Sequence, residues 1–376
     1  MHAAIHALLR LALVFAVTVA QAAPVHHRLE VGLEPAANRV DVQDRLTLPD
    51  AAPRSLAFAL HAGLEPRLIG GGASLVRQGS DTAAGIPVET YRLTLEPGVR
   101  EVTLAYAGEI HHPITELGEE YARSFSVSPG LIGADGVFLG GSSRWLPDFA
   151  GLPYLTFDMT VTLPEGWRSV SQGGRSELTE ADGEVRETWA EGHPQEEVYL
   201  IAAPFSEYRR PGAVADAVVY LREPDEALAG RYLELTDRYL AMYQDLIGDY
   251  PYPKFALVEN FWETGYGMPS FTLLGPRVIR LPFIPYTSYP HEILHNWWGN
   301  GVYVDPDAGN WCEGLTAYLA DHLIKEQQGQ GADYRRSALQ KYADYVRSGK
   351  DFPLTEFTSR HDAVTEAVGY GKCLMI

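Results

Sequence analysis

The sequence predicts an α+β multidomain protein, with an N-terminal antiparallel β domain followed by a mixed α/β domain. Apolar and polar residues alternate at 40–46, 91–95 and 155–161, as expected for strands with one buried face. Turns rich in Gly and Pro separate these runs, which favours antiparallel pairing. After Pro211 the pattern changes to longer segments with helical spacing. A chain of 376 residues is also long enough for two domains.

One segment after that change predicts a long amphipathic helix. Pro224 precedes it and Gly248 ends it, which is the usual placement of these residue types at helix boundaries. Its apolar residues recur at helical intervals: Leu228, Tyr232, Leu235, Tyr239, Met242 and Leu246. We interpret this aromatic stripe as a surface that faces the core and not as a set of ligands.

The first 22 residues are predicted to be a secretory signal peptide. Arg10 closes a short basic region, residues 11–20 are apolar, and Ala20-Gln21-Ala22 fits a cleavage site. The apolar stretch is short for a membrane span, so stable membrane insertion is not expected, and an uncleaved anchor is the alternative. The protein is therefore expected to be secreted or periplasmic.

Charge and cysteine content exclude several classes of protein. The formal net charge is −19 and no dense basic run interrupts it, which argues against nucleic acid as a partner. Only Cys312 and Cys373 occur, so the chain is not a disulfide scaffold. The two could form a bridge in an oxidising compartment, or they could be two small buried thiols. Nothing in the sequence indicates an oligomeric state.

The segment His-Glu-Ile-Leu-His at 291–295 predicts a zinc site. On a helix, His291 and His295 lie one turn apart and about 40° around the axis, so both imidazoles share a face. Glu313 can supply a third ligand from a later helix and leave a fourth position open for water. Glu292 lies beside that face, where it can accept a proton from the water. The pattern predicts one bound Zn²⁺ with Glu292 as the general base.

Cap and turn residues place this site on two helices. Thr287 or Ser288 can cap the first helix, Pro290 fits its first turn, and Gly299 is expected to end it. The second helix is expected to begin just before Glu313. Glu313 would then lie in a first turn, facing back toward the histidines.

The surroundings of this motif resemble the alanyl aminopeptidases and leukotriene hydrolase, which are gluzincin metallopeptidases. The family's x-W-x-G-N continuation is matched at 296–300, its Glu-Gly at 313–314 and its Tyr-x-Lys at 370–372. The sequence Asp-Tyr-Pro-Tyr-Pro-Lys-Phe at 249–255 also looks like the segment that the family places before its substrate-binding strand. The loop between the second histidine and the glutamate is one residue shorter than usual, a difference that a loop can absorb.

The resemblance implies a thermolysin-like catalytic domain at 206–376, preceded by a β-rich domain at 23–205. It also implies that Tyr370 donates to the oxyanion of the tetrahedral intermediate, and that the substrates are peptides or small proteins. The chain stops at Ile376, inside what the pattern predicts to be a buried helix. We therefore expect the catalytic domain to be incomplete at its C-terminus.

One departure from the family concerns the substrate. The family's Gly-Ala-Met-Glu-Asn strand corresponds to residues 266–270, which implies that Gly267, Met268, Pro269 and Ser270 bind substrate. The family's glutamate holds the free amino group of the substrate, and Pro269 stands in its place. Because an unpaired buried cation is costly, we expect weak selectivity for free N-termini.

The favoured function is that of a secreted zinc metallopeptidase that is aminopeptidase-like. Two alternatives use the same scaffold, a zinc hydrolase of non-peptide substrates and a catalytically silent binding protein. The intact Glu292 argues against a silent protein, because a zinc-binding relic has little need of that carboxylate.

Overall fold

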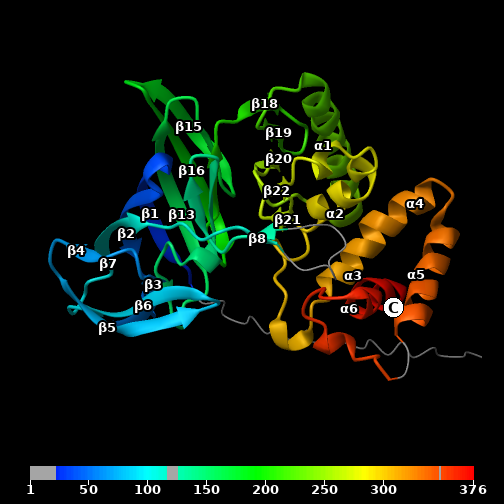
Figure 1. Cartoon of the computed structure of the whole chain (residues 1–376). Helices are drawn as coiled ribbons and strands as arrows, with labels where there is room; N and C mark the ends of the chain where they lie inside the picture. Colours follow the sequence, from blue (N-terminus) through cyan, green and yellow to red (C-terminus); the bar gives the residue numbers. More distant parts are fainter. Residues whose placement is uncertain (1–22, 117–125, 347–348) are drawn as a thin grey trace, which may run out of the picture.

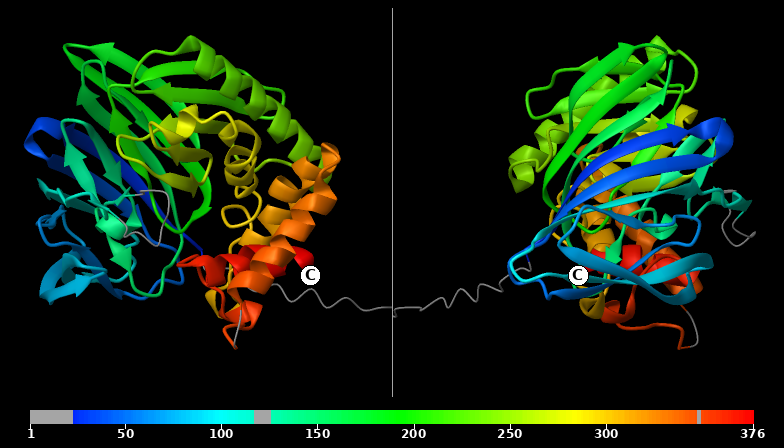
Figure 2. Two further views of the ribbon diagram at one scale, coloured as in Figure 1. Left: turned by 45° about the vertical axis from the view of Figure 1, so that its right-hand side comes forward. Right: turned by 90° about the vertical axis from the view of Figure 1, so that its left-hand side faces the viewer.

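The computed structural model describes residues 23–116, 126–346 and 349–376, and the predicted signal peptide lies outside them. Strands of the N-terminal part lie on one side of the molecule and the helices lie on the other (Figure 1). In the left view of Figure 2, the helices after α2, coloured orange and red, lie together on one side of the molecule. Within the described ranges, no helix is both long and apolar enough to cross a membrane.

A seven-stranded sheet is the largest element of the N-terminal part. Its strand order is β15 (Gly174–Ala181), β16 (Glu184–Gln195), β13 (Leu155–Pro164), β1 (Val25–Glu34), β2 (Arg39–Thr47), β7 (Glu101–Glu109) and β4 (Arg67–Ile69). The expected antiparallel pairing is wrong for one pair, because β1 and β13 run parallel. Alternation of residues carries no information on strand direction, and the chain between these two strands is long enough for a crossover.

Three smaller sheets complete the N-terminal part. The first contains β12 (Asp148–Phe149), β3 (Ser55–His61), β6 (Ile86–Leu95) and β5 (Ala73–Ala83). The second contains β10 (Leu131–Gly133), β11 (Gly136–Leu139), β17 (Leu200–Ala203) and β14 (Arg168–Val170). The third pairs β8 (Thr115–Glu116) with β9 (Ser126–Val127). The predicted N-terminal β domain is thus confirmed as a β-rich region with several sheets.

A five-stranded sheet follows and carries the site region. Its order is β18 (Ser206–Arg210), β19 (Asp216–Leu221), β20 (Lys254–Glu259), β22 (Phe271–Leu274) and β21 (Gly265–Met268). Strands β19, β20 and β22 are parallel, whereas β18 and β21 are antiparallel to their neighbours. Strand β21 is therefore an edge strand, with one side of its backbone outside the sheet.

Helix α1 (Glu226–Ile247) confirms the predicted amphipathic helix. The side chain of Asp225 caps it by accepting from the backbone N–H of Leu228 at 2.9 Å. Tyr232 and Tyr239 are buried against the sheet and α2, so the aromatic stripe faces the core as predicted. Leu246, which the predicted stripe included, lies in the last turn of the helix and is 54% exposed.

The remaining helices are short. They are α2 (Ser288–Leu294), α3 (Cys312–Thr316), α4 (Leu323–Gln327), α5 (Gly331–Tyr345) and α6 (Ala363–Glu366). Two π-helical segments extend them, η6 (Ala317–His322) after α3 and η8 (Ala367–Lys372) after α6. Single 3₁₀ turns are η1 (Pro35–Ala37), η2 (Gly141–Ser143), η3 (Val278–Arg280), η4 (Ile284–Tyr286), η5 (Pro306–Ala308), η7 (Leu354–Glu356) and η9 (Cys373–Met375).

The N-terminal part and the five-stranded sheet share a hydrophobic core. Phe138 and Ile201 from the N-terminal sheets pack with Val218, Val258 and Phe271 of the five-stranded sheet. All five side chains are buried. Strands β21 and β22 are therefore packed from the N-terminal side as well as against α2.

Candidate metal centre

Helix α2 carries His291, and His295 directly follows its last residue, one turn further along the chain. Pro290 lies in its first turn as predicted, but Thr287 does not cap the helix, since its hydroxyl donates to the carbonyl of Phe283 at 3.0 Å. The backbone N–H of His295 donates to the carbonyl of His291 at 3.2 Å. The helix ends at Leu294 and not at Gly299 as predicted, because the following N–H groups bond three residues back in a tighter turn.

Glu313 lies in the first turn of α3 and faces both histidines, as the sequence predicted. Its Oε2 is 3.4 Å from His291 Nε2 and 3.5 Å from His295 Nε2. The three ligand atoms lie within 4.8 Å of one another. Tetrahedral zinc with ligands at ~2.1 Å requires its ligand atoms to be roughly 3.4 Å apart. The distances from Glu313 to the two histidines are therefore those expected between corners of a tetrahedral site.

Neighbouring oxygen atoms orient both imidazole rings. His291 Nδ1 lies 3.4 Å from a carboxylate oxygen of Asp321, and His295 Nδ1 donates to the carbonyl of Trp298 at 3.2 Å. With Nδ1 engaged in this way, each Nε2 is left to face Glu313 and a metal ion. Asp321 was not predicted as a site residue. The sequence does show that it follows Glu313 by about two helical turns, and this spacing is the signal that the sequence contains.

The charges of the triad are strongly coupled. Burial lowers the pKa of His291, but Asp321 and Glu313 outweigh burial and raise it to about 10. Burial likewise opposes ionisation of Glu313, yet hydrogen bonds from the two histidines bring its pKa below its usual range. The carboxylate of Glu313 is therefore ionised at neutral pH, as a metal ligand must be.

The predicted base, Glu292, lies beside the triad and against strand β21. Burial raises the pKa of its carboxyl group, although the positive charges of the two histidines act against this. A Cβ atom placed on Gly267 would be 2.4 Å from Glu292 Oε2 and 3.7 Å from His295 Cδ2. The edge-strand backbone therefore runs directly alongside the base.

The segment 267–270 is only partly available to a substrate. Gly267 is exposed, but Met268, Pro269 and Ser270 are buried, so most of the predicted substrate-binding side chains face inward. Glu263, the nearest acid before this strand, accepts from the backbone N–H of Arg277 at 3.0 Å and from its Nε at 2.8 Å. That ion pair engages Glu263, so the structure offers no acid from this segment to replace the family's glutamate.

Tyr370, which the family resemblance implies as a site residue, lies in the π-helical segment η8 beside His291. Its ring stacks on that of His291 with a centroid distance of 6.2 Å and an interplanar angle of 18°. Burial and the nearby carboxylate of Glu313 raise the pKa of Tyr370, so the hydroxyl keeps its proton and can donate it. The guanidinium of Arg360, which was not predicted, lies 5.6 Å from the centre of the Tyr370 ring.

Both cysteines are free thiols; Cys312 is buried, as the second of the two interpretations has it, whereas Cys373 is partly exposed. The thiol of Cys312 donates to Asn310 Oδ1 at 2.9 Å. Cys373 packs on Gly314, where a Cβ atom would meet its sulfur at 2.2 Å. The helix of Tyr370 therefore lies in close contact with the helix of Glu313.

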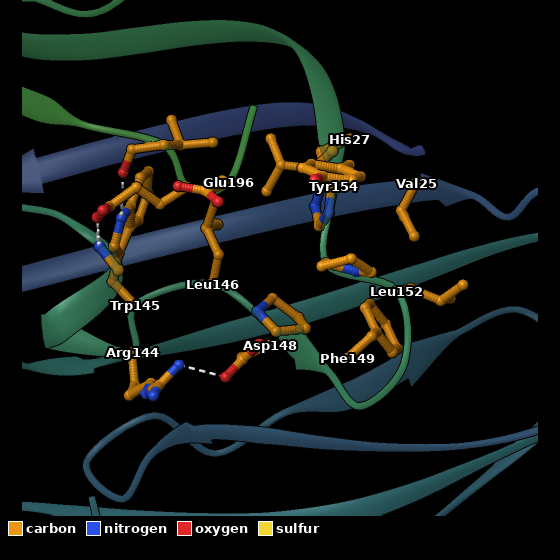
Figure 3. A pocket seen from close by; sticks show the side chains of 16 residues that line it. Val25, His27, Arg144, Trp145, Leu146, Asp148, Phe149, Leu152, Tyr154 and Glu196 are labelled. Atoms are coloured by element: carbon orange, nitrogen blue, oxygen red, sulfur yellow. Dashed lines mark hydrogen bonds and ion pairs between the residues drawn. The ribbon is translucent and has the colours of Figure 1, made fainter. Parts of the chain in front are cut away.

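A separate pocket lies in the N-terminal part (Figure 3). Its walls include Trp145, Phe149 and Tyr154, with an ion pair between Arg144 and Asp148. Among the described residues that line it, none comes from α2 or α3. This pocket is therefore distinct from the metal centre.

Comparison with known proteins supports the fold. The chain matches the M1 zinc metallopeptidase from Deinococcus radiodurans with a TM-score of 0.64 and 20% identity, covering 93% of this chain and 79% of that one. It matches native yeast LTA4 hydrolase with a TM-score of 0.65 and 16% identity, covering 94% of this chain and 58% of that one. A mutant of the Deinococcus enzyme bound to a Tyr-Ser-Ala substrate gives a TM-score of 0.61 at 19% identity, covering 93% of this chain and 80% of that one.

Comparison with protein-family models and with curated protein sequences gives no match. The structural matches nevertheless extend over both the N-terminal β sheets and the five-stranded sheet, since they cover more than nine-tenths of the chain. The arrangement of sheets and helices that brings the triad together is thus the fold of the M1 zinc metallopeptidases and of LTA4 hydrolase.

Proposed function

We propose that this protein is a secreted or periplasmic zinc-dependent peptidase that binds one Zn²⁺ through His291, His295 and Glu313. The observation that carries the proposal is the spacing of the three ligand atoms, which all lie within 4.8 Å of one another. Oxygen and imidazole ligands on two helices are the donor set that Zn²⁺ uses in hydrolytic enzymes. The fold, shared with M1 zinc metallopeptidases, supports the same reaction class.

Glu292 is the general base of the proposed mechanism. Zinc at the triad would polarise the scissile carbonyl and lower the pKa of a water molecule toward ~7. Glu292 lies beside the triad, and it accepts the proton of the attacking water and then delivers it to the leaving amine. The raised pKa of its buried carboxyl group suits both steps.

Tyr370 stabilises the charge that develops on the carbonyl oxygen. Its ring is held against His291, and its hydroxyl keeps its proton because burial and Glu313 raise its pKa. A donor that is fixed before the reaction begins costs no reorganisation when the oxyanion forms. We assign the same role that the family resemblance implies.

The substrate is proposed to be a peptide whose main chain lies along β21. An edge strand offers unpaired backbone groups for an extended peptide, and Gly267 places that backbone against the base. Pro269 brings no charge to the position of the family's glutamate, so the free amino group is not the principal determinant of binding. A related enzyme has been solved with a Tyr-Ser-Ala substrate, which supports short peptides as the first substrates to test.

The division into a β-rich domain at 23–205 and a thermolysin-like peptidase domain at 206–376 is part of this proposal. Strand β17 ends at Ala203 and β18, the first strand of the five-stranded sheet, begins at Ser206, which supports a boundary there. The apolar segment and cleavage site in the first 22 residues support export.

A panel of peptide, amide and ester substrates tests the function. We expect zinc-loaded protein to hydrolyse peptides, chelated protein to be inactive, and zinc to restore activity. Glu292→Gln should bind zinc as before and lose turnover by about 10²–10⁴-fold, because only the base is removed. Hydrolysis of esters alone would indicate a non-peptide hydrolase, and zinc binding without any turnover would indicate a silent binding protein.

A further inference from the structure

The turn between β21 and β22 contains a residue in an uncommon backbone conformation. Met268 pairs with Phe271, so Pro269 and Ser270 form a two-residue turn. Ser270 has a φ of 65°, in the left-handed region that favours glycine. A proline followed by a positive φ is the arrangement of a type II turn, which normally has Gly at the second position. The presence of Ser therefore points to a use for its side chain.

Ser270 is completely buried and contacts three separate parts of the chain. Its hydroxyl oxygen accepts from the Lys254 amine at 2.7 Å and from the backbone N–H of Gly173 at 3.1 Å. Its own N–H donates to Asn296 Oδ1 at 2.6 Å. Asn296 directly follows His295, and its Nδ2 donates to the carbonyl of Ile293 in α2 at 3.0 Å. Ser270 thus connects the turn to the ligand-bearing helix.

Lys254 is the least expected partner in this cluster because it is only 4% exposed. Its Nζ also donates to the carbonyl of Ser270 at 3.3 Å and lies 5.4 Å and 5.5 Å from the ring centres of Trp189 and Phe271. Burial lowers the pKa of this amine to about 7, opposed by Glu191 and assisted by Arg209 and Arg175. A methionine would fill this apolar site without the cost of burying an amine.

We propose that Lys254 and Ser270 are positioning residues, which hold the edge strand β21 at a fixed distance from α2 so that Gly267 presents its backbone to the substrate beside Glu292. The chain of contacts runs from the Lys254 amine through Ser270 to Asn296, and so from β20 through the turn to the metal-binding helix. Gly173 ties the same hydroxyl to the N-terminal part.

We assign Lys254 and Ser270 a role in function, and not only in folding, because they lie close to the backbone that faces Glu292. A glycine at 270 would suit the positive φ, and an apolar residue at 254 would suit the burial, so neither polar group is required for the local fold. Together they fix a turn that is three residues from the backbone facing the base. Unlike Tyr370, neither residue touches the reacting atoms. The inference rests on the proposed peptidase function, because the strand is assigned to substrate binding there.

The test uses Lys254→Met, Ser270→Gly and the double variant in zinc-loaded protein. Ser270→Gly removes the hydroxyl and relieves the positive φ, so it should fold even if Lys254→Met does not. Lys325→Met is the matched control, because its amine lies on helix α4 near Gln330 and away from the turn. Zinc content is measured in each protein and is expected to be unchanged.

We expect each single variant to raise the KM of a tetrapeptide about tenfold, the effect of losing one hydrogen bond to a charged donor, with kcat changed less than about twofold. The KM of a single-residue amide, which spans less of the strand, should change much less. The double variant should lose less than the sum of the two single losses, because both changes remove the same contact between the Lys254 amine and the Ser270 hydroxyl, and each also removes one further bond. An unchanged tetrapeptide KM, or additive losses, would overturn the inference.

A second measurement separates this inference from the proposed function. Amide hydrogen exchange of residues 265–268 should become faster by about tenfold in both single variants and remain unchanged in Lys325→Met. If the native protein shows no zinc-dependent hydrolysis, the proposed function fails. Amide hydrogen exchange then still decides whether Lys254 and Ser270 hold strand β21 in place. Unaltered exchange in both variants would refute the positioning role whatever the activity.

Discussion

Gly369 precedes Tyr370 in the π-helical segment η8, and its replacement by alanine should misplace the oxyanion donor. A Cβ atom at this position would lie 2.2 Å, 2.3 Å and 2.5 Å from three ring carbons of Phe357. Ordinary contacts between carbon atoms are about 3.5–4.0 Å, so the overlap exceeds about 1 Å. Phe357 is only 2% exposed and cannot swing into solvent. Either its ring or η8 must therefore move.

A shift of about 1 Å in a catalytic group costs roughly 10²-fold in rate, and overpacking a core costs about 1–3 kcal/mol. We expect Gly369→Ala to lower kcat by that factor, to lower the melting temperature by several degrees, and to retain zinc. The assays are initial rates on a peptide substrate, calorimetry, and zinc content after dialysis.

Two companion variants make this prediction specific. Gly230→Ala in α1 has no atom within 4 Å of the new methyl group, so it should keep activity and gain up to about 1 kcal/mol of stability. Phe357→Leu combined with Gly369→Ala should recover part of the lost turnover, because the smaller side chain makes room. Full activity of Gly369→Ala, or no recovery in the double variant, would refute the steric argument.

Three further predictions concern chemistry, specificity and pH. Tyr370→Phe should lower kcat about 10²-fold with KM nearly unchanged, which steady-state kinetics can check; a change in KM alone would rule out an oxyanion role. A free-amine peptide and its N-acetylated twin should differ in kcat/KM by less than about 100-fold, equivalent to about 2.7 kcal/mol, and a larger preference for the free amine would mean that another acid binds it. Burial and His112 lower the pKa of His61 to about 4, so the stability that the neutral imidazole contributes is fully present above pH 6.5 and decreases as the pH falls toward 4. Denaturant unfolding should show a loss of stability over this range that His61→Gln reduces, and identical pH curves would contradict this.

Features set by local sequence could be predicted, and features set by distant contacts could not. The stripe from Leu228 to Leu246 has helical spacing, and α1 forms there with Tyr232 and Tyr239 buried. His291, His295 and Glu313 were identified because metal chemistry restricts residue type and spacing, and the structure brings them together. The direction of β1 relative to β13 has no local signal, because their pairing joins residues as distant as Val25 and Leu155.

Burial was the second limit on prediction from sequence. The family resemblance assigned Met268, Pro269 and Ser270 to the substrate, whereas the structure turns them away from solvent. Ser270 instead meets Gly173, 97 positions away in the sequence. A contact between residues so far apart depends on how two sheets pack, which no pattern within either segment encodes.

The hydrophobic core shared by the N-terminal sheets and the five-stranded sheet restricts how this protein can be divided in the laboratory. A polypeptide beginning at residue 206 would lose the partners of Val218, Tyr220, Val258 and Phe271, all of which are buried in the whole chain. It would then present one apolar face of its central sheet to water, a surface that promotes aggregation. Recombinant study of the metal centre should therefore keep the N-terminal sheets, and random truncation libraries should return active clones only when both parts are present.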